Sequence, residues 1–175
     1  MAERAQGLNK TIATDKKWYA IETKVKAEQK VLQLIQNNEN NNLVDIEAYL
    51  PITTIKNKIS PLFKGYIFVK HNDDGFHKMR YQPGVKGYVK FSMYPSIIPE
   101  SQMALMEKVE ANFNNVKTML SHLVKGDKIK IIKGVLAGRE GILTQDAEGK
   151  KIALAIRHLG NSLLIKVPTT DVIAI

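Results

Sequence analysis

The sequence changes character near residue 114, and this change limits the possible folds more than any other feature. Before that point, segments with the alternation of β-strands are interleaved with segments whose apolar residues recur at helical spacing. After it, only short strand-like segments remain, and glycines and turn residues separate them. An α+β unit followed by a small all-β unit is therefore the expected architecture.

The first part predicts an antiparallel sheet with helices on one face. Its strand-like segments are 18–21, 46–52, 62–70 and 85–91, and its helical patterns are 26–36, 76–81 and 99–113. The strongest strand prediction is 62–70, because aromatic and β-branched residues dominate it. Thr23 is the expected N-cap of the first helix, and residues 53–60 are expected to be an irregular, lysine-bearing connection. This order of elements is typical of an α+β sandwich.

The second part predicts a small β-barrel. Its five short strands are expected at 128–131, 142–143, 152–156, 163–167 and 172–175. Closing such a sheet removes its exposed edges, which favours a barrel. We therefore expect four segments: a mobile leader over 1–16, a first domain over 17–114, a polar linker over 115–123 and a second domain over 124–175.

Alternation along the segment 62–70 assigns its aromatic residues to faces. Tyr66 and Phe68 share one face of the strand, and Ile67 and Val69 share the other. One face must cover the helices, while the other could be an exposed apolar binding surface. The alternative is that all of these aromatics belong to the core, since aromatic side chains are commonly buried.

The charge of the chain favours contact with nucleic acid. Lysine and arginine number 26 against 17 acidic residues, which gives a net charge of +9. Such an excess favours phosphate backbones, although a basic surface without any nucleic-acid partner is the alternative. Eight basic residues lie between Thr54 and Lys90, where only Asp73 and Asp74 oppose them. They would form a patch if their strands lie together.

Catalytic and membrane functions find little support in the sequence. The chain has no cysteine, and its four histidines are scattered without metal-ligand spacing. Neither a nucleophile elbow nor a P-loop is present. No apolar run reaches the length of a membrane helix or signal peptide. We expect a cytoplasmic protein without cofactor, metal or enzymatic activity, acting as a monomer.

Two sets of motifs resemble the NusG family of transcription elongation factors. The segment KGDKIKIIKGVLAGREGIL resembles the KOW motif, with Gly126, Asp127, Gly134, Gly138 and Gly141 in place. Three upstream segments resemble the family's N-terminal (NGN) domain and occur in the family's order. They are KKWYAIETKVKAEQKV, PLFKGYIFVK and MRYQPGVKGYVKF. The resemblance covers about residues 17–175. It implies an NGN domain followed by an SH3-like KOW barrel.

The resemblance also implies partners and site residues. The NGN domain would bind the clamp helices of RNA polymerase through an apolar depression and suppress pausing or termination. The residues carried over to this depression are Tyr19, Phe63, Tyr66 and Phe68. Lys24, Lys26 and Arg80 would face upstream or non-template DNA. The barrel would recruit Rho or a small-subunit ribosomal protein.

Departures from the family pattern leave several alternatives open. Lys64 stands where the family usually has proline, which favours a specialised paralogue of the RfaH or UpxY groups over the housekeeping factor. KOW motifs also occur in ribosomal proteins, so a ribosome-associated RNA-binding protein is the second hypothesis. An enzyme acting on nucleic acid is the third, and it would need a metal site or an acid–base cluster.

Overall fold

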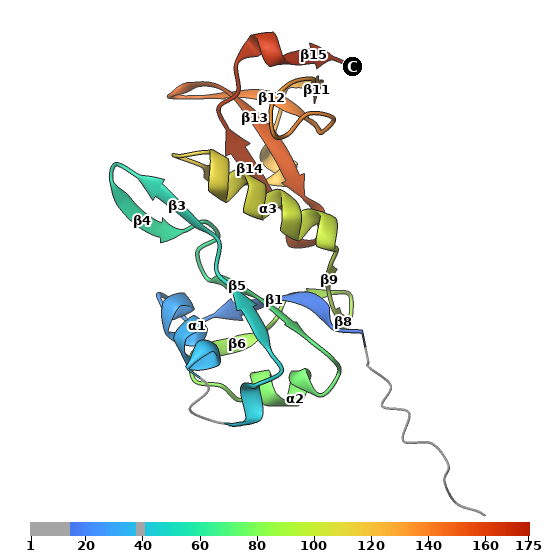
Figure 1. Ribbon diagram of the computed structural model, residues 1–175. Coiled ribbons are helices and arrows are strands. Elements are labelled where there is room, and N and C mark those ends of the chain that lie inside the picture. Colours follow the sequence, from blue (N-terminus) through green and yellow to red (C-terminus); the bar gives the residue numbers. More distant parts are fainter. Residues whose placement is uncertain (1–14, 38–40) are drawn as a thin grey trace, which may run out of the picture.

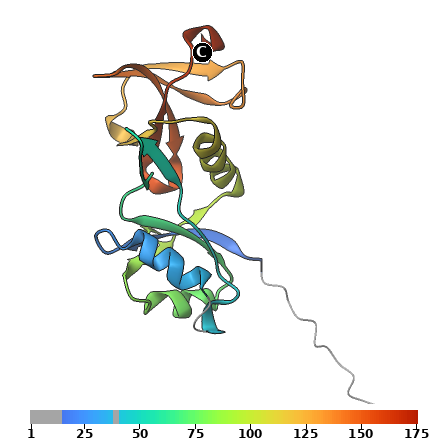
Figure 2. The same cartoon turned by 60° about the vertical axis from the view of Figure 1, so that its left-hand side comes forward.

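The computed structural model describes residues 15–37 and 41–175 (Figure 1). Two β-sheets lie at opposite ends of the molecule, and helix α3 lies between them in both views (Figures 1 and 2). The expected leader, 1–16, lies outside the described residues apart from Asp15 and Lys16. Lys16 forms an ion pair with Glu47, with 3.7 Å between Nζ and Oε1. No helix in the described ranges is long and apolar enough to cross a membrane.

The first sheet is antiparallel and forms the scaffold of the N-terminal part. Its order is β2 (Glu47–Tyr49), β5 (Tyr66–His71), β1 (Lys17–Thr23) and β6 (Val85–Tyr88), and β9 (Ile97–Ile98) also pairs with β1. Strands β5 and β1 are central, and Ala20 lies opposite Phe68 in their register. The sequence therefore predicted four of these strands in order, but the segment expected over 62–70 becomes a strand only at Tyr66, and β9 was not expected.

Helices cover both faces of this sheet, which differs from the expected single helical face. Helices α1 (Glu28–Gln36) and α2 (Gly75–Arg80) pack on the face that carries Ile21, Ile67 and Val69. Helix α3 (Glu100–Asn112) packs on the opposite face, which carries Ala20 and Phe68. The reason is the near-continuous burial of β1: since both of its faces are apolar, both have to be shielded from water.

Several local features also differ from expectation. Helix α1 begins at Glu28 with Ala27 as its N-cap, while Thr23 ends β1 and its buried hydroxyl has no hydrogen-bond partner.

The segment expected as a connection is mostly a hairpin of β3 (Ile52–Ile55) and β4 (Lys58–Pro61). Its turn residues Lys56 and Asn57 have positive φ values of 49° and 62°. This conformation matches the right-handed twist of paired strands, and asparagine favours it. A second hairpin joins β7 (Lys90–Phe91) to β8 (Tyr94–Pro95).

The second sheet contains six antiparallel strands, one more than expected. Its order is β10 (Lys117–Leu120), β14 (Asn161–Ile165), β13 (Gly149–Ile156), β12 (Glu140–Asp146), β11 (Asp127–Ile131) and β15 (Val172–Ala174). Strands β11–β15 match the five predicted segments, whereas β10 lies within the expected linker, 115–123. Single 3₁₀ turns occur at Asn41–Leu43, Ser121–Leu123, Arg157–Leu159 and Thr169–Asp171.

Polar contacts explain why the expected linker is ordered as β10. Lys117 donates to Glu148 over 2.5 Å, and Lys151 donates to Glu148 over 2.9 Å. These two hydrogen bonds lower the pKa of Glu148 to about 2. Just before β10, the amide of Asn115 donates to the carbonyl of Thr54 in β3 over 3.0 Å. A stretch that is polar by composition is thereby held to β14, to the β12–β13 turn and to the β3–β4 hairpin.

The two ends of the molecule share one apolar core around α3. Phe68 and Met106 from the N-terminal part belong to the same cluster of buried side chains as Ile129 and Leu154 of the second sheet. The side chain of Gln102 in α3 also lies 3.3 Å from the Nδ1 atom of His158. Helix α3 thus packs in a core that both sheets share, and residues 117–120 of the expected linker pair with β14 as strand β10.

A buried histidine packs within aromatic rings on the α1/α2 face. The His71 ring stacks on Tyr19 with 4.9 Å between centroids, and Phe76 and Tyr88 meet it edge-on. Its Nδ1 atom lies 2.5 Å from the carbonyl of Asn72, and Nε2 lies 2.8 Å from the Tyr88 hydroxyl. A neutral ring satisfies both contacts, because Nδ1–H donates to the carbonyl and Nε2 accepts from the hydroxyl. Burial lowers the pKa of His71 below its ordinary value of 6.5.

The protein should consequently lose stability as the pH falls from 7.5 to 5. In the unfolded chain His71 takes up a proton near pH 6.5, whereas the folded state resists protonation until a lower pH. The stabilising contribution is complete above pH 6.5 and declines as the pH falls toward the lowered pKa. Melting temperatures across this range test the expectation. His71→Phe should flatten the decline, and the exposed His77→Gln should leave it unchanged. An equal slope in His71→Phe would assign the decline to other groups.

Candidate protein-binding groove

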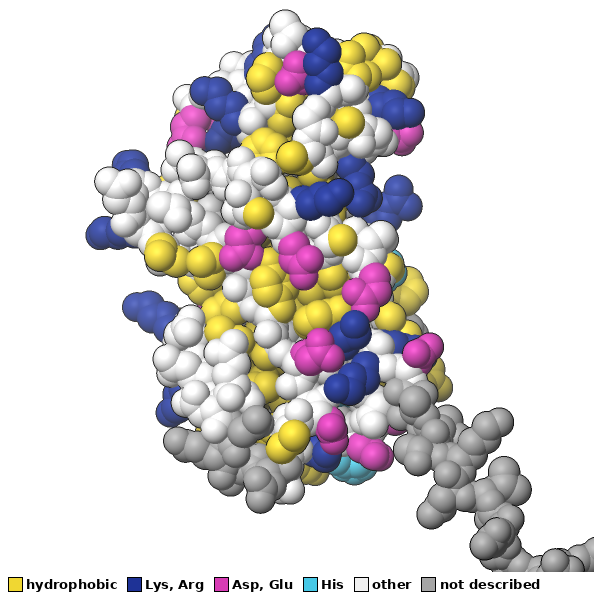
Figure 3. Space-filling view, in the orientation of Figure 1, with side chains coloured by type: hydrophobic (Ala, Val, Ile, Leu, Met, Phe, Trp, Pro, Cys, Tyr) yellow, Lys and Arg dark blue, Asp and Glu magenta, His cyan; other side chains and the backbone are white. Residues whose placement is uncertain are grey.

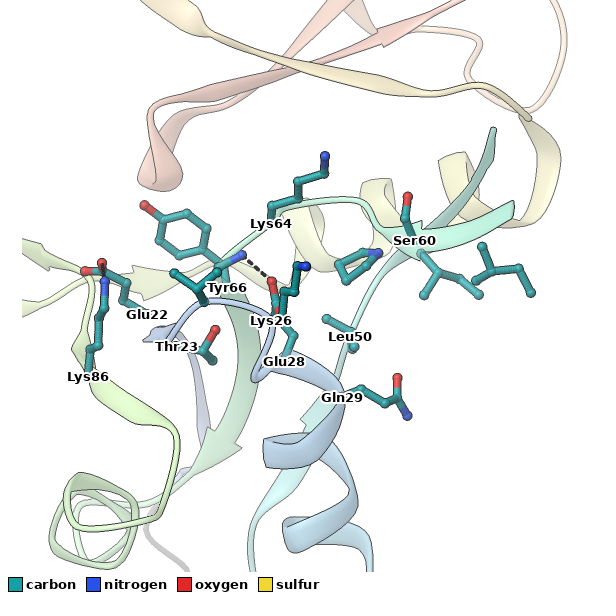
Figure 4. A pocket seen from close by; sticks show the side chains of 15 residues that line it. Glu22, Thr23, Lys26, Glu28, Gln29, Leu50, Ser60, Lys64, Tyr66 and Lys86 are labelled. Carbon is teal, nitrogen blue, oxygen red and sulfur yellow. Dashed lines mark hydrogen bonds and ion pairs between the residues drawn. The ribbon is translucent and has the colours of Figure 1, made fainter. Parts of the chain in front are cut away.

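A groove of about 720 Å³ opens beside the start of β5 (Figure 4). It lies between the turn that joins β1 to α1 and the β3–β4 hairpin. Apolar side chains form much of its wall, and charged side chains are spread among them. The apolar lining residues are Val25, Leu50, Ile52, Ile59, Pro61 and Tyr66, and the charged ones are Glu22, Lys26, Glu28, Lys64 and Lys86.

Hydrogen bonds fix the backbone that carries Tyr66. The carboxylate of Glu28, at the start of α1, accepts a hydrogen bond from the amide of Gly65 over 2.6 Å (Figure 4). The amide of Thr23 donates to the carbonyl of Gly65 over 2.8 Å. Gly65 has a φ of 83°, a conformation that glycine adopts without steric cost. Because this turn is tied to both β1 and α1, the Tyr66 ring projects from a rigid support.

Tyr66 is the most accessible of the four residues carried over to the polymerase site. Its side chain is half-buried and lines the groove, whereas Phe63, Phe68 and Tyr19 are 3%, 0% and 4% exposed. Phe63 and Phe68 lie behind it, with their rings edge-on at 5.9 Å. Both belong to the core cluster around α3, and Tyr66 packs against that cluster. The structure therefore brings Phe63, Tyr66 and Phe68 together.

Tyr19 lies on the opposite face of the same sheet. Its ring packs against His71, Phe76 and Tyr88 beneath α2, in the core cluster that contains Ile67 and Val69. Burial, followed by the negative charge of Asp73, raises the pKa of Tyr19. The alternation of the sequence around position 19 would have revealed this separation, because Trp18 and Ala20 are the β1 residues on the Phe68 face.

Helix α3 is held against the Phe68 face by a polar contact and by charge. The hydroxyl of Tyr49, in β2, donates a hydrogen bond to the carboxylate of Glu110. Burial and this bond both raise the pKa of Tyr49. At the other end of α3, Lys70 forms an ion pair with Glu100, with 2.8 Å between Nζ and Oε1. In Figure 3, apolar side chains form a band below α3, and acidic side chains lie along the helix.

The second sheet approaches Tyr66 from above (Figure 4). A cavity of about 380 Å³ lies between Tyr66 and this sheet, and Phe63, Val116, Lys117 and Asn161 contribute to its lining. Tyr66 lines both this cavity and the groove. A partner bound at Tyr66 would therefore lie next to β10 and β14.

The three residues carried over to the nucleic-acid site lie along one edge of the first sheet. Lys24 and Lys26 are exposed in the turn after β1, and Arg80 is exposed at the end of α2. The amide of Lys24 donates to the carbonyl of Gly84 over 2.8 Å, which joins the two segments. Lys26 lines the groove, while Arg80 lines a separate cavity near the β7–β8 hairpin. Lys86 contributes to both cavities; it is one of the eight basic residues between Thr54 and Lys90, but it was not among the residues carried over to the nucleic-acid site.

The glycines of the KOW-like segment have structural roles. A Cβ atom at Gly126 would lie 1.8 Å from the carbonyl oxygen of Leu143, and one at Gly141 would lie 2.8 Å from that of Ala153. These two glycines permit close approach among neighbouring strands. Gly134 and Gly138 lie in the loop between β11 and β12, and Asp127 begins β11. Among residues 15–37 and 41–175, no cluster of three acidic, histidine or cysteine side chains could hold a metal ion.

Comparisons with known proteins agree with this architecture. Residues 16–107, more than half of the chain, match the family model described as transcription termination factor nusG. The transcription termination/antitermination proteins NusG from two strains of Helicobacter pylori are 25% and 24% identical over 166 residues, covering 86% of this chain and 93% of theirs. A solved structure described as "Domain interaction in Thermotoga maritima NusG" has a TM-score of 0.61 at 24% identity, covering 90% of this chain and 96% of that one. The chain belongs to the NusG family of transcription termination/antitermination factors.

Proposed function

We propose that this chain binds the clamp helices of RNA polymerase through the groove beside Tyr66 and suppresses pausing or termination. The observation that carries the proposal is the position of Tyr66. It is a half-buried aromatic ring in an apolar groove, on the segment whose motif resembles the family's polymerase-binding strand. Helix-in-groove contacts take most of their binding energy from a few such anchors.

The chemistry of the groove suits an amphipathic helix. Leu50, Ile52 and Pro61 offer apolar wall, and Val25 and Ile59 are 84% and 71% exposed at its sides. Exposed apolar side chains that gather around one hollow are typical of binding surfaces. The charged lining residues would meet the polar side of such a helix, as in the rims of protein interfaces.

The other carried-over residues take different places in this proposal. Phe63 and Phe68 support Tyr66 from behind, and because both are buried they would act on a partner through this packing. Tyr19 lies beneath α2, and its influence on the partner would be indirect, through the packing of β1. Tyr66 is therefore the residue whose substitution tests the groove most directly.

The basic edge of the first sheet is proposed to face upstream or non-template DNA. Lys24, Lys26 and Arg80 are exposed there, and the net charge of the chain is +9. Because each neutralised phosphate releases counterions, such binding should weaken steeply with salt. The second sheet, with its glycine-rich β11–β12 loop, is proposed to be the KOW barrel that recruits Rho or a small-subunit ribosomal protein.

The decisive experiment compares polymerase with ribosomes. Full-length tagged chain should retain core RNA polymerase from its native host and shorten pauses in single-round transcription with that enzyme. An excess of isolated clamp-helix hairpin should compete for the binding. Retention of ribosomal subunits without polymerase would instead favour the ribosome-associated, RNA-binding hypothesis and overturn the proposal.

A further inference from the structure

Lys64 lies in a tight turn between the groove and the second sheet. The amide of Tyr66 donates to the carbonyl of Phe63 over 3.2 Å, and Gly65 has a φ of 83°. These features are typical of a type II β-turn, with Lys64 at its first central position and Gly65 at its second. Phe63 is buried before the turn, and the amide and carbonyl of Gly65 are both hydrogen-bonded. The backbone of Lys64 is therefore fixed, while its side chain is exposed.

Lysine is not the residue that this turn favours. Proline is preferred at the first central position of a type II turn, because its ring already holds the φ angle that the turn requires. A proline in a compatible position also stabilises a protein by restricting the unfolded chain. Lysine forgoes this stabilisation and instead places an ammonium group two residues away from Tyr66. The turn itself gains nothing from that charge.

The Lys64 side chain lies where two hollows of the surface meet. Like Tyr66, it lines both the groove and the cavity of about 380 Å³ next to the second sheet. In Figure 4 the side chains of Lys64 and Tyr66 both extend toward the second sheet. A partner that covers the Tyr66 ring would therefore also meet the Lys64 ammonium group.

The charges of the groove leave an excess of positive charge at this corner. Glu22 is neutralised by Lys86, with 2.9 Å between Oε1 and Nζ. The carboxylate of Glu28 accepts a backbone amide over 2.6 Å. Within the described part of the chain, no ion pair involves Lys64 or Lys26. The rim of an apolar groove thus carries two cations without an acidic partner, and a partner with a carboxylate there would complement them.

We propose that Lys64 selects the partner of the groove by pairing with a carboxylate of the bound helix. The apolar side of that helix packs on Tyr66, and an aspartate or glutamate about one turn away meets the Lys64 ammonium group. One helical turn rises about 5.4 Å, and two positions along a chain span at most about 7 Å, so one face of a helix can make both contacts. A helix with a basic residue at that place is repelled, and the charge thereby sets which clamp-helix hairpins bind. This inference rests on the proposed function, and it adds the residue that gives the groove its specificity.

Binding of the host polymerase's isolated clamp-helix hairpin to the full-length chain at low salt tests this pairing. Lys64→Gln should bind the labelled hairpin about threefold to tenfold more weakly, and Lys64→Glu about 30-fold or more, because a like charge then faces the carboxylate. The affinity of the parent should fall more steeply with added salt than that of Lys64→Gln, since salt screens the ion pair. Lys64→Pro suits the turn and should melt at or above the parental temperature, yet lose as much affinity as Lys64→Gln.

A charge exchange then identifies the carboxylate. When each acidic residue of the clamp-helix hairpin is changed to lysine in turn, one of these hairpins should bind Lys64→Glu about tenfold or more tightly than it binds the parent. A purely structural role of Lys64 would give no such rescue. Lys58→Glu reverses an exposed charge on β4 outside the groove lining, and it should bind every hairpin within about twofold of the parent.

The outcomes separate this inference from the proposed function. Parental affinity in Lys64→Gln, or failure of Lys64→Glu to rescue any of the altered hairpins, would overturn the pairing while binding of the parent still supports the proposed function. A parent that does not bind the clamp-helix hairpin would overturn the proposed function and the pairing with it.

Discussion

Changing Tyr66 to aspartate should abolish polymerase binding and antipausing activity while both sheets remain folded. Tyr66 lines the groove with its ring half-buried, and its backbone is fixed by Glu28 and Thr23 through Gly65. An aspartate there would place a charge against the apolar surface of a bound helix. Burial of an uncompensated charge costs several kcal/mol, so we expect affinity to fall by roughly 100-fold or more.

Two control variants test whether a loss of binding in Tyr66→Asp comes from the groove. Tyr66→Phe keeps the ring and should bind within about tenfold of the parent, since it removes only a hydroxyl. Val135→Asp introduces the same charge at an exposed apolar position near β11 and should bind as the parent does. Circular dichroism and thermal melting show whether each variant is folded. A folded Tyr66→Asp protein with parental affinity would remove this residue from the interface.

The faces of the central strands could be predicted from the sequence, because alternation depends only on local geometry. Tyr66 and Phe68 point to one face and Ile67 and Val69 to the other, as the pattern of β5 indicated. The same rule applied to β1 would have separated Tyr19 from this group. The family resemblance placed all four aromatics in one depression, and three of them do lie together.

The groove itself could not be predicted, because long-range contacts build it. Its far wall is the β3–β4 hairpin, which the sequence suggested only as an irregular connection. Its floor depends on the hydrogen bond between Glu28 and Gly65, which are 37 residues apart. Strand β10 was missed for a similar reason, since it is held by pairing with β14, which is distant in the sequence, and by ion pairs of Lys117 with the β12–β13 turn.

Replacing Phe68 with alanine should destabilise the protein strongly. Phe68 is fully buried, and its ring packs edge-on against Phe63 at 5.9 Å and beside Tyr49 at 6.4 Å. Removing a buried phenyl ring costs about 3–5 kcal/mol through lost transfer energy and the cavity that remains. For a chain of this size, the melting temperature should fall by roughly 6–20 °C.

Substitutions of Phe68 also separate its effect on stability from its effect on the groove. Because Phe68 lies beneath α3 in the core that both sheets share, its loss should loosen the support of Tyr66 as well as the whole fold. Phe68→Leu fills most of the cavity and should lose much less stability. If polymerase binding falls sharply in Phe68→Leu while its melting temperature stays near the parental value, the groove depends on the shape of the Phe68 ring beyond its contribution to stability. Parental affinity in that variant, together with a large loss of stability in Phe68→Ala, would make Phe68 a core residue that acts on the groove only through packing.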